Sequence, residues 1–379
     1  MNQPQNKNPK KRVYRNREGL LWFAIGFAII IIVGVTVGIF LHKPDVDDTP
    51  NFPTDDPAEQ TTDIGASAEP YVRKDGFYTF LVAGVDDVSM STDVMMLVSL
   101  DTVNEKLSIL QIPRDTFVNS AVGGFTTVHR VNAVFTGEYN RRINNGMSAK
   151  TAKPQAMEAL CDHLEKTLCI TIDEYLLINT SSFCSIVDAV GGIDFDVPFD
   201  MFYEDPEQDL YIDLKAGFQH LDGKQCEQLI RYRDGYSRGD IERMEMRAAF
   251  MSALFSQVKS KIGVETLVAL LEQDKTVFTK TCTSMSFNDA ISYIRMIYRV
   301  KDGDMDVRTV AGAVVQNPES GLWLYFCLNR KAALADINEC MNVYTREITL
   351  ENFDKVGFFT DTENAYNAYI HEYYSSDTE

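Results

Sequence analysis

The chain has 379 residues, 45% of them hydrophobic, so it is long enough to bury one large core or two modest ones. Its formal net charge at pH 7 is −19, and acidic residues predominate after Leu41, which argues against nucleic acid as a ligand. The seven cysteines are scattered singly without C-x-x-C pairs, which argues against a zinc ribbon or a dithiol redox site. Cys161, Cys169 and Cys184 sit among apolar neighbours and are predicted to be core residues, while disulfide pairing of the later cysteines stays open.

An uncharged apolar segment from Leu20 to Leu41 is the clearest feature near the start of the chain. At helical rise it covers the roughly 30 Å of bilayer hydrocarbon, which predicts a transmembrane helix over 20–41. A cleaved signal peptide is the alternative, but the run is long for a signal core and offers no small-x-small cleavage site, which favours an uncleaved anchor. Basic residues precede the segment and acidic residues follow it, so residues 1–19 are predicted to be a cytoplasmic tail and the remainder extracytoplasmic.

Composition divides the extracytoplasmic part into three segments. Residues 42–74 are rich in Asp, Pro, Thr and Ala and poor in large apolar side chains, which predicts a disordered acidic linker. A folded domain is expected over 75–345, followed by an acidic C-terminal tail over 346–379. The chain shows no internal repeat.

Three apolar runs open the folded domain and predict strands over 77–85, 94–100 and 107–112. The polar connector 101–106 has hairpin length, which predicts that the second and third strands are antiparallel neighbours. Helical spacing of Met157, Leu160, Leu164 and Leu168 then predicts a helix over 149–168.

A strand, a helix and a strand follow within a short stretch, which indicates an α/β domain. The strands are predicted over 175–178 and 193–197, and the helix over 183–190 with Ser181 or Ser182 as its cap. Further helices are predicted over 222–232, 240–260, 263–272 and 286–299.

Five arginines and no lysine occur between residues 231 and 247 of this acidic domain: Arg231, Arg233, Arg238, Arg243 and Arg247. The guanidinium is a planar fork that matches phosphate oxygens two at a time, so the cluster favours a phosphate or diphosphate ligand. In extended chain Arg231 and Arg233 point the same way, whereas Asp240, Arg243 and Arg247 share one helix face. Pairing of these arginines with nearby acids on a solvated surface is the alternative, and spacing alone does not decide between them.

Acidic residues end the first predicted strand and open the second. Asp86 and Asp87 follow Gly84-Val85, and Asp93 comes after the loop 88–92. Magnesium prefers one or two carboxylates together with waters and phosphate oxygens, so two aspartates here would suffice for a metal site. From spacing alone, ordinary turn residues are the commoner explanation.

The third predicted strand ends in Ile112-Pro113-Arg114-Asp115, where the proline restricts the backbone just ahead of a charged pair. A turn ion pair is the ordinary explanation of this motif.

Taken in order, these motifs resemble the LytR-CpsA-Psr family. Each segment is weak alone, but the ordered set from Gly84 to Arg243 is specific. The segments are Gly84-x-Asp86, Thr92-Asp93, Ile112-Pro113-Arg114-Asp115, Arg130-x-Asn132-Ala133, Asp188-x-x-Gly191-Gly192-x-Asp194, Leu221-Asp222-Gly223, Arg231-x-Arg233 and Asp240-x-x-Arg243.

The resemblance implies a three-layer α-β-α fold with a central mixed sheet, preceded by one N-terminal transmembrane helix, in a Gram-positive cell membrane. It also implies an extracytoplasmic phosphotransferase that attaches a glycopolymer, such as teichoic acid or capsule, to peptidoglycan. The donor would be a polyprenyl diphosphate carrier and the acceptor the muramic acid 6-hydroxyl. A non-catalytic polyprenyl-diphosphate-binding sensor, scaffold or regulator of wall assembly is the alternative.

The family's functional residues carry over by position. Asp86 and Asp93 would hold Mg²⁺, and Arg114 and Asp240 would join them in the catalytic set. The prenyl chain would occupy an apolar tunnel lined by the helices over 181–190 and 240–260, and the general base stays open among Asp86, Asp93 and Asp115. The residues expected to bind substrate phosphate are Arg114, Arg130, Arg231, Arg233, Arg243 and Arg247.

Four positions depart from the family pattern. Val88 and Ser91 stand where the family often has arginines, which predicts weaker glycopolymer positioning or transfer. Arg130 replaces a lysine and keeps its charge, and Arg247 replaces a glutamine and adds a charge, so phosphate binding is expected to persist.

Overall fold

The computed structural model describes residues 71–86, 90–118, 130–189, 191–205, 210–237, 240–264, 281–316 and 323–353, with residues 44, 46, 266, 268, 358 and 359. The predicted cytoplasmic tail and the transmembrane helix over 20–41 lie outside these residues, as do most of the linker and of the C-terminal tail. Within the described part of the chain, none of the helices is both long enough and apolar enough to cross a membrane.

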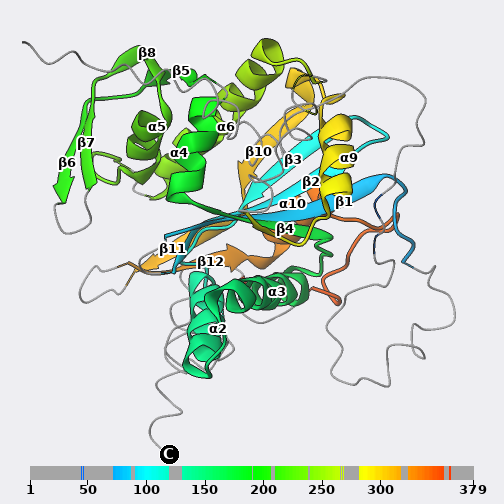
Figure 1. Ribbon diagram of the computed structural model, residues 1–379. Coiled ribbons are helices and arrows are strands. Elements are labelled where there is room, and N and C mark those ends of the chain that lie inside the picture. The colour runs from blue at the N-terminus through cyan, green and yellow to red at the C-terminus, as the bar shows by residue number, and fades with distance from the viewer. Residues whose placement is uncertain are drawn as a thin grey trace, which may run out of the picture.

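A six-stranded mixed sheet forms the centre of the fold, as predicted (Figure 1). The strand order is β10-β3-β2-β1-β4-β9, in which β1 pairs antiparallel with β2 and parallel with β4. The second and third strands are antiparallel neighbours, which confirms the prediction from their short connector. The strands are β1 (Phe77–Val85), β2 (Thr92–Asp101), β3 (Lys106–Gln111), β4 (Glu174–Asn179), β9 (Cys282–Thr283) and β10 (Met305–Thr309).

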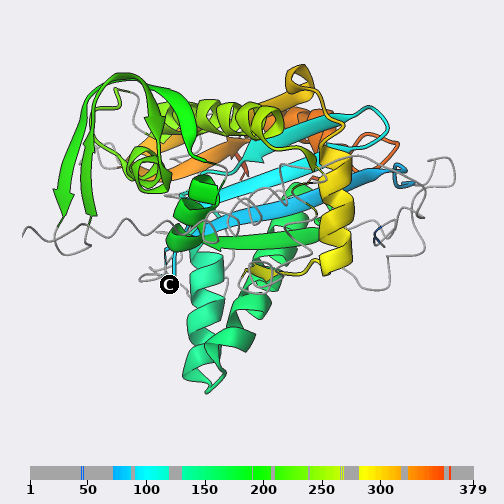
Figure 2. The same ribbon diagram turned by 45° about the horizontal axis from the view of Figure 1, so that its top comes forward.

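Helices cover both faces of this sheet (Figures 1 and 2). On one face lie α2 (Asn132–Asn144), α3 (Ala149–Leu168) and α10 (Arg330–Cys340). On the other lie α4 (Thr180–Ala189), α5 (Gly223–Arg231), α6 (Asp240–Lys261) and α9 (Phe287–Ile297), and a 3-10 turn, η5 (Asp302–Asp304), leads into β10. A second small sheet contains β11 (Gly312–Gln316), β12 (Trp323–Asn329) and β13 (Phe358–Phe359).

The two helical layers explain why β1 and β2 are apolar on both faces. Along β1, Phe80 points into the core under α6 and α9, where its ring meets Tyr293 edge-on at 4.7 Å. Its neighbour Leu81 points the other way, into the core shared with Phe135 and Leu160 of α2 and α3. A strand buried on both sides reads as a continuous hydrophobic run rather than an alternating one.

A long antiparallel hairpin, here called the β-arm, stands beside the central sheet (Figure 2). Its outgoing strands are β5 (Ile193–Val197) and β6 (Met201–Asp205), and its returning strands are β7 (Leu210–Leu214) and β8 (Gly217–Leu221). β5 pairs with β8 and β6 with β7, both antiparallel. Only β5 was predicted from the sequence.

The folded part extends slightly beyond the predicted domain limits. Arg73, expected in the linker, forms a buried ion pair with Asp173 at 2.6 Å. Beyond the predicted end at residue 345, Ile348 and Phe353 are buried in the core. The predicted linker and tail are therefore wrong over 71–74 and 346–353, because apolar and charged side chains there find partners on the sheet and α3.

Two smaller predictions resolve at the residue level. Asn179, not Ser181 or Ser182, caps α4, since its Oδ1 accepts the amide of Ser182 at 2.8 Å and the helix starts directly after β4. All seven cysteines are free thiols. Cys161 and Cys169 are buried as predicted, whereas Cys184 is half-buried.

Candidate functional site

The two aspartates predicted to bind metal stand at the ends of neighbouring strands. Asp86 follows β1, and Asp93 is the second residue of β2. Met90 lies in the left-handed region at φ 53°, and its amide donates to the Asp86 carbonyl at 2.8 Å. Both aspartates line the same cavity.

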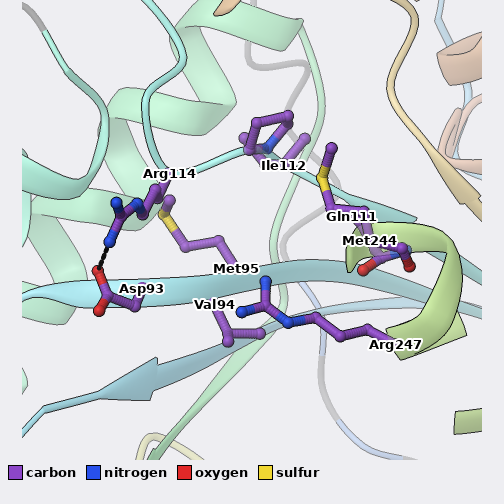
Figure 3. Close-up of a pocket in the computed structure, with 9 residues that line it drawn as sticks. Asp93, Val94, Met95, Gln111, Ile112, Arg114, Met244 and Arg247 are labelled. Atoms are coloured by element: carbon purple, nitrogen blue, oxygen red, sulfur yellow. Dashed lines mark hydrogen bonds and ion pairs between the residues drawn. The ribbon is translucent and has the colours of Figure 1, made fainter. Parts of the chain in front are cut away.

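Arg114 links the Ile-Pro-Arg-Asp motif to this carboxylate pair. Its Nη1 donates to Asp93 Oδ1 at 3.0 Å (Figure 3). Its Nε lies 3.5 Å from Asp115 Oδ2. The other oxygen of Asp115 is 3.4 Å from Arg130 Nη1, and the Arg130 guanidinium lies over the ring of Tyr325 at 5.7 Å. Asp115 thus holds two cations together, but neither it nor Arg130 is among the described residues that line the cavity.

Helix α6 supplies two more arginines, one turn apart. Arg243 is buried, and the half-buried Arg247 extends over β2 in the direction of Asp93 (Figure 3). Gln111, at the end of β3, donates from Nε2 to the Met244 carbonyl at 3.1 Å, which fixes the start of α6 against the sheet. This buried contact sets where both guanidiniums lie.

Four guanidiniums gather around Asp93. Arg233 Nη2 lies 3.5 Å from Asp93 Oδ2, and burial followed by repulsion from Arg114 lowers the pKa of Arg233. Burial lowers the pKa of Arg243 to about 9 and that of Arg247 to about 10, and repulsion from neighbouring guanidiniums adds to both shifts. A cluster of guanidiniums favours a ligand with several negative oxygens.

Arg231 and Arg233 have different partners. Arg231 is the last residue of α5 and donates from Nη1 to Glu227 Oε1 at 2.9 Å, whereas Arg233 follows the helix and meets Asp93. Helix α5 confirms the helix predicted over 222–232, so the two arginines do not share an extended segment. Both arginines nevertheless line the cavity.

The cavity has a volume of about 870 Å³ and two chemically different regions. Asp86, Asp93, Arg233 and Arg247 gather at the strand ends. Arg231, Glu227 and Asp234 add further charges to the lining. The remaining wall lies between the sheet and the helices and is largely apolar. Its lining includes Val82, Val94, Met96, Ile178, Phe183, Ile230, Phe250 and Met251.

The predicted apolar tunnel corresponds to this second region. Phe183 of α4 and Phe250 and Met251 of α6 line it, as expected for the helices over 181–190 and 240–260. A cavity with cations at one end and hydrocarbon-like walls elsewhere fits an amphipathic molecule with an anionic head.

The carboxylate pair suits magnesium only when a substrate completes its ligands. Among the described residues no group of three His, Cys, Asp or Glu side chains can hold a metal ion. Magnesium commonly takes one or two carboxylates and fills its remaining positions with water and phosphate oxygens, which Asp86 and Asp93 beside the arginine cluster allow. Arg114 and Ser91 orient Asp93 by donating to its Oδ1 at 3.0 and 3.2 Å.

Three further positions from the sequence motifs have different outcomes. Ser91, which stands where arginine is frequent in the family, donates to Asp93 and accepts from Asn132 Nδ2 at 3.3 Å. Asp240 is the first residue of α6, but its side chain lies outside what the structure describes, and so does Val88.

Sequence reasoning missed two residues of the site. Glu227 is a buried carboxylate in the cavity wall, where it accepts from Lys224 Nζ at 2.7 Å as well as from Arg231. Glu227 lies four residues before Arg231 on a predicted helix, a spacing that indicates an ion pair. No local pattern indicates the contact of Gln111, because its partner on α6 is distant in the sequence.

The fold and the arginine-lined cavity define the class of protein. The model of the LytR_cpsA_psr family matches residues 49–339. This chain belongs to the LytR_cpsA_psr family.

Individual relatives are similar at modest identity. The polyisoprenyl-teichoic acid–peptidoglycan teichoic acid transferase TagV of Bacillus subtilis is 27% identical over 52% of this chain and 47% of the relative. The TagU transferase of the same description from Oceanobacillus iheyensis is 27% identical over 67% of this chain and 74% of the relative. The chain spans about half the length of TagV and of LcpA, a cell wall biosynthesis protein of Corynebacterium glutamicum.

Solved structures share the fold. The crystal structure of B. subtilis TagV has a TM-score of 0.52 at 22% identity, covering 69% of this chain and 94% of that one. Protein gbs0355 from Streptococcus agalactiae has a TM-score of 0.55 at 18% identity, covering 69% of this chain and 86% of that one.

Proposed function

We propose that this chain is a membrane-anchored, extracytoplasmic phosphotransferase that attaches a glycopolymer from a polyprenyl diphosphate carrier to the muramic acid 6-hydroxyl of peptidoglycan. The family membership and the names of the relatives support transfer of a wall glycopolymer. The observation that carries the proposal is the amphipathic cavity, because its cationic end and apolar wall match a diphosphate joined to a long hydrocarbon.

The cavity residues would hold the two halves of the donor separately. Arg233 and Arg247 line the cavity and would bind phosphate oxygens, and the prenyl chain would lie against Phe183 and Met251. The buried Arg243 is not among the described residues that line the cavity and would add its positive charge from behind the wall. Arg231 would contribute less charge than expected, since Glu227 already binds it. Arg130 would act through Asp115 rather than from the cavity wall.

In the reaction, the acceptor hydroxyl oxygen forms a bond to the phosphorus that carries the glycopolymer. The bond from that phosphorus to the bridging oxygen breaks, and polyprenyl monophosphate leaves with that oxygen. The hydroxyl proton passes to a carboxylate; Asp86 and Asp93 line the cavity, whereas Asp115 is held between Arg114 and Arg130. Arg114 and Arg247 would stabilise charge on the phosphate oxygens as the bond breaks.

Magnesium held by Asp86 and Asp93 would neutralise diphosphate charge when bound. The other steps depend on the arginines and the cavity walls.

The test uses the full chain purified in detergent with a synthetic polyprenyl diphosphate-linked saccharide. Magnesium-dependent release of polyprenyl monophosphate is expected, with Asp86→Asn slowing release by about 10²-fold or more. Lipid that co-purifies should be identified by mass spectrometry and should be lost from the double variant Arg233→Gln, Arg247→Gln, which removes two guanidiniums that line the cavity.

Arg299→Gln provides the control, because Arg299 pairs with Glu105 at the surface. Tight lipid binding without metal-dependent release would favour the non-catalytic sensor, and lipid retention by the double variant would contradict the assigned binding residues.

A further inference from the structure

Exposed aromatic side chains are concentrated on the β-arm. In the part of the chain that the structure describes, six large hydrophobic residues are exposed, and the four aromatic ones all belong to this hairpin. Phe218 is 77% exposed, Phe202 63% and Tyr211 51%, while Tyr203 is at the edge of the cavity. A monomer gains nothing from aromatic rings left in water, so this grouping points to a ligand.

The register of the β-arm pairs each of the three most exposed rings with a carboxylate. Phe202 lies opposite Asp213, Tyr211 opposite Glu204, and Phe218 opposite Asp196. Residues directly opposite in an antiparallel pair share a face, so rings and carboxylates stand side by side on the outer face.

The β-arm packs on the rest of the protein through its inner face, and the exposed aromatic rings take no part in this packing. Met201, Ile212 and Leu214 are buried there and belong to the core cluster that contains α5 and α6. The outer rings therefore do not contribute to the core.

The β-arm also adjoins the cavity. Tyr203 of β6 and Leu210 of β7 are part of the cavity lining. A polymer attached to a diphosphate in the cavity would meet this hairpin on its way to solvent.

We propose that the outer face of the β-arm binds uncharged sugar rings of the donor's glycopolymer. This inference rests on the proposed function and adds a substrate class to it. The C–H face of a pyranose ring packs on an aromatic ring, and its hydroxyl groups donate to neighbouring carboxylates. Three ring–carboxylate pairs along one hairpin match a chain of repeating sugars.

The charges on the β-arm favour a neutral saccharide over two other occupants. Among its described residues, Lys215 pairs with Asp213 at 3.2 Å, and His220 Nδ1 lies 2.6 Å from Asp194 Oδ1. Lys261, at the end of α6, also lies 3.4 Å from Asp194. Carboxylates remain in excess, which disfavours a polymer of phosphodiesters and an anionic bilayer surface.

The experiment measures binding of three probes to the full chain in detergent by calorimetry. The probes are a neutral hexasaccharide of N-acetylglucosamine, poly(glycerol phosphate) and phosphatidylglycerol vesicles. The hexasaccharide should bind best, and the triple variant Phe202→Ala, Tyr211→Ala, Phe218→Ala should weaken its binding by about tenfold or more. Val103→Ala, which removes an exposed side chain on the β2–β3 turn, should leave binding unchanged.

Equal hexasaccharide binding by wild type and triple variant would overturn the inference, as would a preference of the outer face for poly(glycerol phosphate) or vesicles. Tyr211→Phe keeps the ring and should bind as wild type, which separates loss of stacking from misfolding. The calorimetric experiment contains no donor lipid, so it tests saccharide binding separately from transfer. If the hexasaccharide binds as expected but the transfer reaction fails, only the proposed function is contradicted.

Discussion

Asp93 is the residue on which the candidate site depends most, because its two oxygens orient Arg114 and Arg233 on opposite sides. Arg247 extends toward the same carboxylate from another element. The family resemblance assigned Asp93 to this site as a magnesium ligand and the arginines to phosphate. It did not predict that Arg114 and Arg233 pair with Asp93, because these residues are distant from it along the chain.

The first prediction concerns Arg247→Gln, which restores the family's residue. It removes one half-buried cation from the cavity lining, so affinity for inorganic pyrophosphate should fall about tenfold, the effect of one charge-assisted contact. Less mutual repulsion should also make the ligand-free variant more stable than the wild type. Calorimetry and thermal unfolding, with Arg299→Gln as the control, check both; a gain in pyrophosphate affinity would contradict the assignment.

The second prediction concerns Glu174, whose pKa burial raises from 4.5 to about 7, with Ser284 donating to it at 2.5 Å and Asp289 and Asp173 nearby. As pH rises, the unfolded chain loses this proton before the folded chain does. The free energy of unfolding should therefore fall between pH 4.5 and 7, by about 1 kcal/mol after allowance for solvent screening.

Glu174→Gln should remove that fall, as measured by urea unfolding across this pH range. Glu351→Gln, at an exposed position, should follow the wild-type profile. If the free energy of unfolding of Glu174→Gln falls with pH as it does in the wild type, this carboxyl does not cause the pH dependence.

At the scale of elements, helices α4 and α5 pack very closely against each other beside the cavity. A Cβ added at Gly223 would lie 1.9 Å from the carbonyl oxygen of Cys184, and the Gly223 amide donates to Asp188 Oδ1 at 2.6 Å. Only a residue without a side chain allows the two helices to approach this closely.

The third prediction follows from that contact. Gly223→Ala should destabilise the fold by about 1–3 kcal/mol, because backbone rather than a flexible side chain must move. Gly303→Ala is the control, since a Cβ there meets nothing within 4 Å. Equal midpoints of denaturant unfolding for the two variants would contradict the packing argument.

Element prediction succeeded where one physical signal dominated. Strands β1 to β3 and helix α3 show continuous apolar runs or a clear helical stripe, and they appear where expected. Most of the β-arm was missed because aromatic residues on its exposed face blur the alternation of apolar and polar residues that identifies a strand, and because Pro198 interrupts the pattern. Its register, which depends on pairing between distant strands, has no local signal.

At the scale of the whole molecule, the cavity lies between the sheet and the helices α4 and α6. The family resemblance predicted an apolar tunnel along the helices over 181–190 and 240–260, and Phe183 and Phe250 of these helices line the cavity. Helical patterns alone did not predict a space between the helices and the sheet. That space depends on how layers pack, which one chain's sequence does not specify locally.

The fourth prediction separates the two regions of the cavity. Met251→Trp adds bulk to the apolar wall, so binding of a polyprenyl diphosphate should weaken at least tenfold while inorganic pyrophosphate binds as before. Calorimetry with both ligands checks this. The control is Val103→Trp, which introduces the same side chain at an exposed position outside the cavity. Equal losses for both ligands would mean that the regions are not independent.

The crowding of guanidiniums around Asp93 has a consequence for the lifetime of the protein in the cell. A fold that holds repelling cations is less stable empty than loaded, so each bound donor lowers the fraction of molecules exposed to proteases. The cellular amount of the protein would then rise and fall with the supply of its lipid donor. Pulse-chase half-lives measured with and without blocked donor synthesis would test this, and an unchanged half-life would exclude such coupling.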